Sequence, residues 1–323
     1  MFHFKVKSLK AFIIVIIFTF SYFFYFGGFY NISPSSDMSR YYGFYNHLAT
    51  FSMISESDYG LHEAILTASA RDPFFMLIFF IFSNLGLSFQ SFLLLIIFLF
   101  NYSFSRIAIA IGYTNYLSFF IFLSLSSFWM TYFINVVLRQ GLALLPFIFF
   151  LYFFSNKKFL KGSINLSISY LIHGMSILAI PFLFLRSLFL KNIYFLHIPF
   201  IITYILYISG VLVLTSDLIV TVTNIIGIDL RAMNSESGYV VGPTLMKSIA
   251  IITPFFVIFA TGVGTMHPLI REFYIFYIYI EIIGMFLSGF PYHDRIMLIG
   301  WVLSPFLIGH GFLFYFSRHK KPF

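Results

Sequence analysis

Residues 134–176 read INVVLRQGLALLPFIFFLYFFSNKKFLKGSINLSISYLIHGMS. This stretch is the strongest indication in the chain of its fold and of its orientation in a membrane. Two apolar segments flank a short basic turn at residues 156–161. Each apolar segment carries an ionisable side chain at the end far from the turn, Arg139 in the first and His173 in the second. Two apolar segments joined by a lysine-rich turn predict a pair of membrane helices whose turn is cytoplasmic. Arg139 and His173 would then approach each other near the opposite face.

The composition of the whole chain indicates an integral membrane protein. Sixty per cent of its residues are hydrophobic, 9% are charged, and the mean hydropathy is +0.94. The apolar runs are continuous, which excludes the alternating pattern of a barrel strand. We therefore expect an all-α, polytopic transmembrane helical bundle of about 8–11 membrane helices, some of them broken or half-spanning. Residues 1–323 are expected to form a single integral membrane domain.

The charges at the start of the chain set the expected topology. Lysines precede an apolar run at residues 11–26, and no small-residue cleavage site follows it. This pattern predicts a retained first helix with a cytoplasmic N-terminus. The longest polar stretches, at about residues 27–73 and 215–243, are then expected as outer loops.

The remaining apolar segments are expected to be helices. Three of them are short and predict half-helices or a broken helix: residues 74–87, 89–104 and 116–134. The others are residues 136–154, 163–190, 193–214, 244–263, 273–290 and 296–316. Within residues 163–190, His173-Gly174 and Pro181 predict interruptions, which membrane helices tolerate where the backbone lines a cavity.

Arginine is retained on the predicted outer side, although lysine is nearly absent there. The outer arginines are Arg40, Arg71, Arg139, Arg231 and Arg295. The positive-inside bias accounts for the lysines but not for these residues. Arginine binds phosphate and carboxylate in a bidentate fork, which favours an anionic substrate at the outer face. The alternative is that the arginines pair with outer carboxylates or reach the membrane interface, and that His173 bonds a backbone carbonyl.

Polar residues of the predicted outer side form a candidate site. They are Asp37, Arg40, Arg139, Gln140, His173 and Arg295. Glu281 lies in the middle of a predicted span and needs a partner or a cavity. A carboxylate or imidazole can take a proton from a sugar hydroxyl, and arginines can neutralise a leaving phosphate. This combination suits glycosyl transfer from a lipid-linked diphosphate donor.

The sequence resembles the EpsG family of Wzy-like polysaccharide polymerases. Residues 138–143 (LRQGLA) match the family's R-Q-x-x-A element, and residues 171–176 (LIHGMS) resemble its following H-x-S element. Residues 37–42 (DMSRYY) are similar to its D-x-x-x-Y pattern. Residues 71–75 (RDPFF) and 85–92 (LGLSFQSF) are similar to its acidic-aromatic and L-G-x-S-F-Q stretches.

The resemblance implies a GT-C/Wzy-like fold and a multi-pass protein of the bacterial inner (cytoplasmic) membrane. It implies transfer between undecaprenyl-diphosphate-linked oligosaccharide repeats at the periplasmic face, without a metal or other cofactor. Arg40, Arg139, Gln140 and Arg295 would bind the substrate and its diphosphate. Asp37 or His173 would be the general base. Expected partners are membrane lipid and a chain-length regulator protein. Nucleic acid is not expected, since the net charge of +8 reflects the cytoplasmic flanks.

Other functions stay open at this point. A lipid-linked oligosaccharide transporter or flippase would use the same arginines, but it predicts an internal repeat, and the sequence shows none. A polyprenyl-phosphate-sugar glycosyltransferase would place an acidic residue in the first outer loop, as Asp37 is. An O-acyltransferase would use an intramembrane histidine such as His173.

Overall fold

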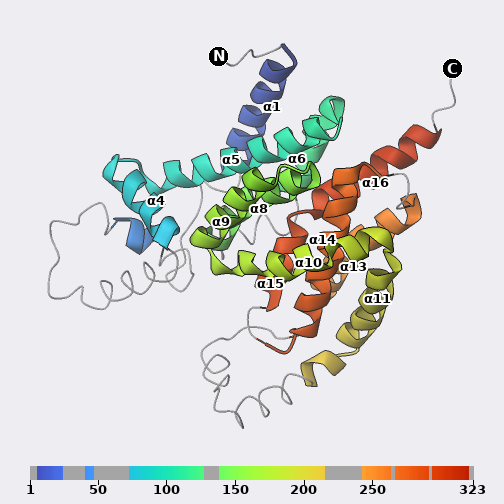
Figure 1. Ribbon diagram of the computed structural model, residues 1–323. Helices are drawn as coiled ribbons and strands as arrows, with labels where there is room; N and C mark the ends of the chain where they lie inside the picture. The colour runs from blue at the N-terminus through green and yellow to red at the C-terminus, as the bar shows by residue number, and fades with distance from the viewer. Residues whose placement is uncertain are drawn as a thin grey trace, which may run out of the picture. The chain divides into compact units, whose positions relative to one another are not determined.

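The computed structural model describes seven segments of the chain (Figure 1). They are residues 6–24, 41–46, 73–126, 138–214, 242–262, 266–290 and 293–319. Within these segments the regular structure is helical and contains no strand, which confirms the all-α class. The chain divides into two compact units, Met1–Ile177 and Leu178–Phe323. The expected single membrane domain stays a prediction.

Unit 1 (Met1–Ile177) contains two groups of packed helices. In the first group α1 (Val6–Tyr22), α5 (Phe89–Ala110) and α6 (Leu117–Leu125) contact one another. In the second group α8 (Leu138–Ser155) packs along α9 (Phe159–Ile172). The shorter α4 (Pro73–Asn84) contacts α9, and α5 contacts α8.

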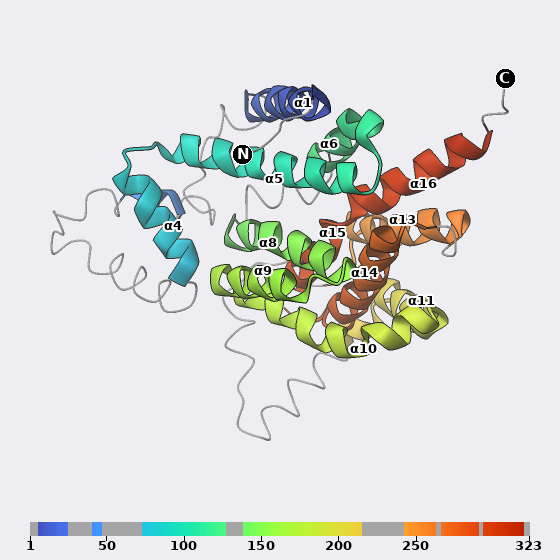
Figure 2. The same cartoon turned by 45° about the horizontal axis from the view of Figure 1, so that its top comes forward.

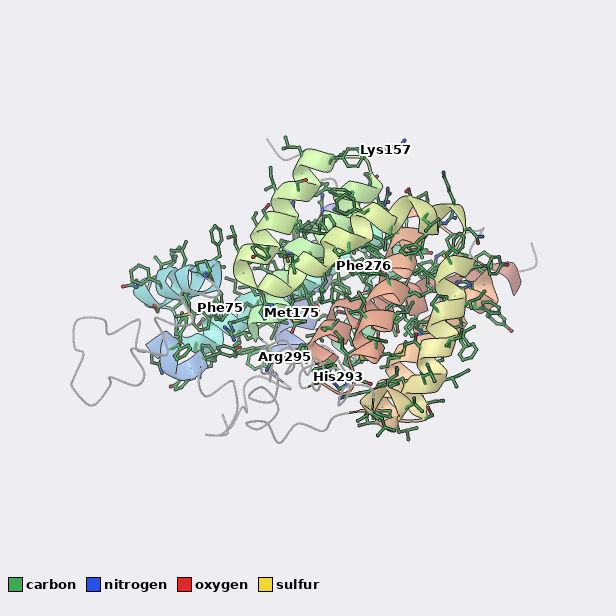
Figure 3. All side chains as sticks on the ribbon, turned by 60° about the horizontal axis from the view of Figure 1, so that its bottom comes forward. Phe75, Lys157, Met175, Phe276, His293 and Arg295 are labelled. Carbon is green, nitrogen blue, oxygen red and sulfur yellow. The ribbon has the colours of Figure 1, made fainter. Side chains whose placement is uncertain are left out.

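The predicted helix pair is present as the α8–α9 hairpin. Only residues 156–158 separate the two helices, and Lys157 has a φ of 58°. The left-handed conformation at one residue lets the chain reverse within this short turn. Figure 3 shows Lys157 at the turn and Met175 at the opposite end of the hairpin. The two helices are therefore antiparallel, as their apolar pattern predicted.

The predicted interruption after α9 is also present. α9 ends at Ile172, and His173 is extended, with φ −157° and ψ 122°. A 3-10 turn, η4 (Gly174–Leu178), leads directly into α10 (Ala179–Lys191). Pro181 does not interrupt the chain a second time, because it lies in the first turn of α10, where the backbone N–H has no intrahelical partner to lose.

Unit 2 (Leu178–Phe323) is built around α14 (Pro268–Phe286), as Figure 2 shows. This helix contacts α10, α11 (Tyr194–Ile208), α13 (Leu245–Thr261), α15 (His293–Trp301) and α16 (Ser304–His319). Side chains on every side of α14 are buried, among them Phe273, Tyr277 and Ile280. A helix that is apolar all round occupies the core of its bundle.

Two predicted boundaries differ from the structure. The segment predicted at residues 89–104 continues to Ala110, because Ser103 and Ser105 bond the carbonyls of Leu99 and Asn101 and so keep their hydroxyls satisfied inside the helix. The last predicted span, residues 296–316, is two helices, α15 and α16. They are joined by a turn immediately before Ser304-Pro305, because proline breaks the helical hydrogen bonding there.

Four described stretches are long and apolar enough to cross a membrane. They are Phe89–Ala110, Leu138–Ser155, Gly174–Lys191 and His293–Tyr315. Several shorter apolar helices accompany them, including α4 with 12 residues and Thr114–Leu125. Of the three short segments expected between residues 74 and 134, α4 and Thr114–Leu125 are short, whereas α5 is long enough to span, and residues 127–134 lie outside the described residues. The chain is thus a multi-pass helical membrane protein, and the total of 8–11 spans stays a prediction.

Candidate functional site

Arg139 lies in the first turn of α8, at the end of the hairpin far from the lysine turn. Its side chain is half-buried, and its Nε donates a hydrogen bond to the Tyr41 hydroxyl at 3.2 Å. The guanidinium carbon also lies 5.8 Å from the centre of the Tyr41 ring. This distance is within the range of a cation–π contact. Tyr41 therefore orients the guanidinium without neutralising its charge.

The short helix at residues 41–46 is fixed by aromatic packing. The Tyr41 ring packs edge-on against Phe75 of α4 at 5.6 Å. Tyr45 packs against Phe79 of the same helix at 5.4 Å and donates its hydroxyl to the carbonyl of Leu87 at 3.0 Å. The position of Tyr41 is thus set by α4 and the turn after it. Asp37 and Arg40 precede this helix in sequence and lie outside the described residues.

The α8–α9 hairpin brings Arg139 and His173 to the same end. The Ser169 hydroxyl of α9 donates to the Ala143 carbonyl of α8 at 2.7 Å. Arg139 precedes Ala143 by one helical turn, and His173 follows Ser169 by one turn. Because the two helices are antiparallel, one turn back along α8 and one turn forward along α9 both lead to the same end of the hairpin. Gln140, next to Arg139, is buried with 2% of its surface exposed.

His173 is half-buried and its ring is oriented by its own turn. The backbone N–H of Met175 donates to Nδ1 of His173 at 3.3 Å. Because Nδ1 accepts this bond, the neutral imidazole carries its proton on Nε2. His173 therefore presents a hydrogen-bond donor beyond its turn. The hydroxyls of Ser169 and Ser176 share a further hydrogen bond across the helix break and hold η4 against α9.

Arg295 belongs to unit 2 and lies in the first turn of α15 (Figure 3). Its side chain is half-buried. The structure thus brings Arg139, Gln140 and His173 together within unit 1, whereas Arg295 belongs to a separate set of residues in unit 2. The roles predicted for all of them stay predictions.

Three further ionisable residues of unit 2 were not assigned a role from sequence. His293 and Asp294 are buried, with 2% and 6% of their surface exposed, and Lys247 of α13 is half-buried. Asp294 interacts electrostatically with both Lys247 and His293. The run of three ionisable residues at 293–295, between two apolar segments, was the available sequence signal.

Glu281 is fully buried inside unit 2. Its carboxyl packs directly over Gly300 of α15, where the absence of a side chain leaves room for it. The indole of Trp301 interacts with the carboxyl without meeting the full geometry of a hydrogen bond. A buried carboxyl at this position was expected to need a partner, and that partner is Trp301 of α15.

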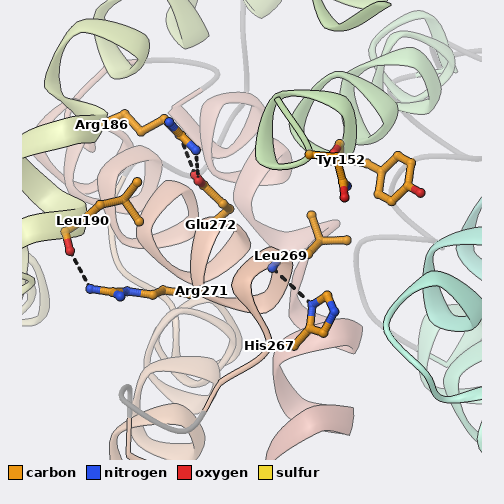
Figure 4. Close-up of polar contacts among 8 residues, drawn as sticks. Tyr152, Arg186, Leu190, His267, Leu269, Arg271 and Glu272 are labelled. Atoms are coloured by element: carbon orange, nitrogen blue, oxygen red, sulfur yellow. Dashed lines mark hydrogen bonds and ion pairs between the residues drawn. The ribbon is translucent and has the colours of Figure 1, made fainter. Parts of the chain in front are cut away.

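The other end of α14 carries an ion pair (Figure 4). Arg186 of α10 donates from Nε to Glu272 at 2.9 Å, and its Nη2 bonds the second carboxylate oxygen. Nearby, Arg271 donates to the carbonyl of Leu190. His267 accepts from the N–H of Leu269 at 3.2 Å, and burial lowers the pKa of His267, which favours the neutral ring. The two arginine contacts join α10 to α14, whereas His267 caps the N-terminus of α14.

No cluster of three His, Asp or Glu side chains suited to a metal occurs in the part of the chain that the structure describes. The charged chemistry available there is that of arginine, lysine, histidine and buried carboxyl groups. The expectation of a metal-free site stays a prediction.

The long apolar helices and the α8–α9 hairpin define a multi-pass helical membrane protein. The sequence matches the EpsG family over residues 12–322, nearly the whole chain, and the chain therefore belongs to the EpsG family. Comparison with curated proteins and with solved structures gave no match. Family membership indicates polysaccharide biosynthesis by a glycosyltransferase-like polymerase in general.

Proposed function

We propose that this protein polymerises polysaccharide repeats at the periplasmic face of the bacterial inner membrane, with its N-terminus in the cytoplasm. Its substrates are oligosaccharide repeats linked to undecaprenyl diphosphate. The observation that carries the proposal is the arginine–histidine pair at one end of the α8–α9 hairpin, in a chain of the EpsG family. An always-charged guanidinium that Tyr41 orients suits a diphosphate.

The reaction needs cations for more than one phosphate group. Both the growing chain and the incoming repeat are attached to a lipid diphosphate. Arg139, Arg40 and Arg295 are the proposed diphosphate-binding residues, and Gln140 supports Arg139. Asp37 or His173 is the proposed general base. Membrane lipid and a chain-length regulator protein are the proposed partners.

Polymerisation joins the two substrates in one displacement. A hydroxyl of the incoming repeat loses its proton, and its oxygen forms a bond to the anomeric carbon of the growing chain. The bond from that carbon to the diphosphate breaks, and the diphosphate leaves with the electron pair. Arginine stabilises the negative charge that gathers on the leaving group.

Gene deletion with complementation tests this function. The deletion strain should make surface polysaccharide with a single repeat, and wild type should restore long chains. Arg139→Ala and His173→Ala should fail to restore them. Arg106→Ala removes an exposed arginine of α5 and is the matched control, which should behave as wild type. Immunoblots of the membrane fraction must show equal amounts of each protein.

Two outcomes would contradict the proposal. An unchanged chain-length distribution in the deletion strain would exclude polymerisation in that host. Loss of even the single repeat would indicate repeat assembly or transport of the lipid-linked oligosaccharide.

A further inference from the structure

His293 has the geometry of a proton acceptor. Its Nδ1 lies 3.1 Å from the carbonyl oxygen of Phe290, at the start of α15. A carbonyl oxygen only accepts hydrogen bonds, so Nδ1 must carry the proton. The lone pair of the neutral ring is then on Nε2. This atom is buried and has no hydrogen-bond partner among the residues that the structure describes.

His173 has the opposite tautomer. In His173 the Nδ1 accepts from the N–H of Met175, so its proton is on Nε2. His173 can take a proton only by giving up that bond. His293 can take one at Nε2 while keeping its bond to Phe290. Of the two rings, His293 is the one already prepared to act as a base.

Cationic groups of the same unit lie beside His293. Lys247 of α13 interacts with it electrostatically, and Asp294 interacts with both of them. The N–H of Gly242 donates to the Ser288 carbonyl at 3.1 Å and ties the start of α13 to the end of α14. The Thr244 hydroxyl caps α13 by accepting from the N–H of Lys247 at 3.3 Å.

The helix itself adds to this positive potential. His293 is the first residue of α15, and Arg295 lies in the same turn. The backbone N–H groups of a first helical turn favour an anion. An anion here would meet Lys247, Arg295 and the helix N-terminus. The buried Nε2 of His293 belongs to the same turn.

We propose that Lys247, His293 and Arg295 form a second ligand site, within unit 2, for a sugar linked to a lipid diphosphate, and that Nε2 of His293 accepts the proton of the attacking hydroxyl. This inference rests on the proposed function and assigns its general base to His293 in place of Asp37 or His173. Lys247 and Arg295 bind the diphosphate oxygens. The charge of Asp294 acts on both Lys247 and His293 and offsets the repulsion between the lysine and a protonated ring.

The hydroxyl proton moves to the lone pair on Nε2, and the oxygen forms the new bond to the anomeric carbon. The bond between that carbon and the diphosphate breaks, and its electron pair leaves with the diphosphate. The imidazolium then releases its proton to water, which restores the neutral ring.

Two substitutions separate a base from a structural histidine. His293→Asn retains a side-chain N–H that can reach the Phe290 carbonyl, but it removes the basic nitrogen. His293→Gln retains a polar group near the position of Nε2, but an amide does not accept a proton. The assay uses purified full-length protein in detergent with an undecaprenyl-diphosphate-linked repeat and measures kcat and KM.

Both variants should lower kcat by about 100-fold or more, with KM changed little. Lys247→Met should instead raise KM and leave kcat nearer to the wild-type value. Thermal unfolding of each variant should match that of wild type.

Each contrary result has a distinct meaning. Wild-type kcat in His293→Asn would overturn the base assignment and make the ring a helix cap. Loss of folding in both variants would likewise show that His293 is structural. A wild-type protein that does not extend the lipid-linked repeat would instead overturn the proposed function.

Discussion

At the scale of single residues, the contact between Arg139 and Tyr41 is the most informative. Tyrosine contributes a hydroxyl acceptor and an aromatic face to the same guanidinium. Both contacts restrict the orientation of the arginine, and neither adds a negative charge. We expect an arginine held in this way to lose less rotational freedom if an anionic ligand binds to it.

Removing the Tyr41 hydroxyl should weaken activity without abolishing it. Tyr41→Phe deletes one hydrogen bond, whose net value of about 0.5–1.5 kcal/mol corresponds to a roughly 2–10-fold lower polymerisation rate. Tyr41→Ala also removes the ring and should cost more. Rates with a lipid-linked repeat test this, with Tyr102→Phe, at an exposed tyrosine of α5, as the control. A wild-type rate in Tyr41→Ala would refute the orienting role.

At the scale of elements, two different kinds of contact hold α14 to its neighbours. Toward α15 it uses close approach, because the Glu281 carboxyl lies over Gly300. Toward α10 it uses charge, because Glu272 pairs with Arg186. Mutation should disrupt the first contact by steric overlap and the second by leaving a buried charge unpaired.

A methyl group at position 300 should destabilise the protein. A Cβ there would collide with Glu281 and Ile280, and overpacking of a core costs about 1–3 kcal/mol. Gly300→Ala should therefore lower the thermal midpoint measured by intrinsic fluorescence in detergent. Gly43→Ala is the control, because a Cβ there meets no atom within 4 Å. Equal midpoints in the two variants would disprove the close approach.

Breaking the ion pair should cost more than replacing it. Arg186→Ala leaves the carboxylate of Glu272 buried without its partner, and such a loss costs about 3 kcal/mol. Arg186→Met combined with Glu272→Met removes both charges and should recover most of that stability. Chemical unfolding in mixed micelles gives the free energies. If the double variant is less stable than Arg186→Ala, the pair stabilises the protein beyond its charge balance.

At the scale of the whole molecule, the expected topology follows from the placement of lysine and arginine. The α8–α9 turn is basic, and Arg139 and His173 lie at the far end of its helices. The positive-inside bias then predicts a cytoplasmic turn and a periplasmic arginine–histidine end.

Cysteine labelling tests this topology directly, because the chain contains no cysteine. A single Lys157→Cys should react with a membrane-impermeant maleimide only after the cells are opened. Ser235→Cys, in the second polar stretch, should react in cells whose inner membrane is intact. Labelling of both positions from the same side would contradict the predicted orientation, and so would the reverse pattern.

Apolar runs, a basic turn and the His173-Gly174 dipeptide were sufficient to predict the hairpin and the helix break. These are local signals, and the membrane makes them strong, since each spanning segment must satisfy its own backbone. Contacts between distant residues were not predictable. Arg139 meets Tyr41 across 98 positions, and Arg186 meets Glu272 across 86. The opposite tautomers of His173 and His293 depend on single backbone atoms, to which hydropathy is insensitive.

The linkage between Ser169 and Ala143 has a consequence for how the chain enters the bilayer during synthesis. α9 is not among the stretches apolar enough to span, and it carries Asn165, Ser167 and Ser169. A segment of this kind partitions poorly into lipid by itself. With only a short turn between them, α8 and α9 can pair while still beside the translocon, so that the carbonyl of Ala143 receives the serine hydroxyl before lipid surrounds it. We expect the hairpin, and not either helix, to be the unit of insertion.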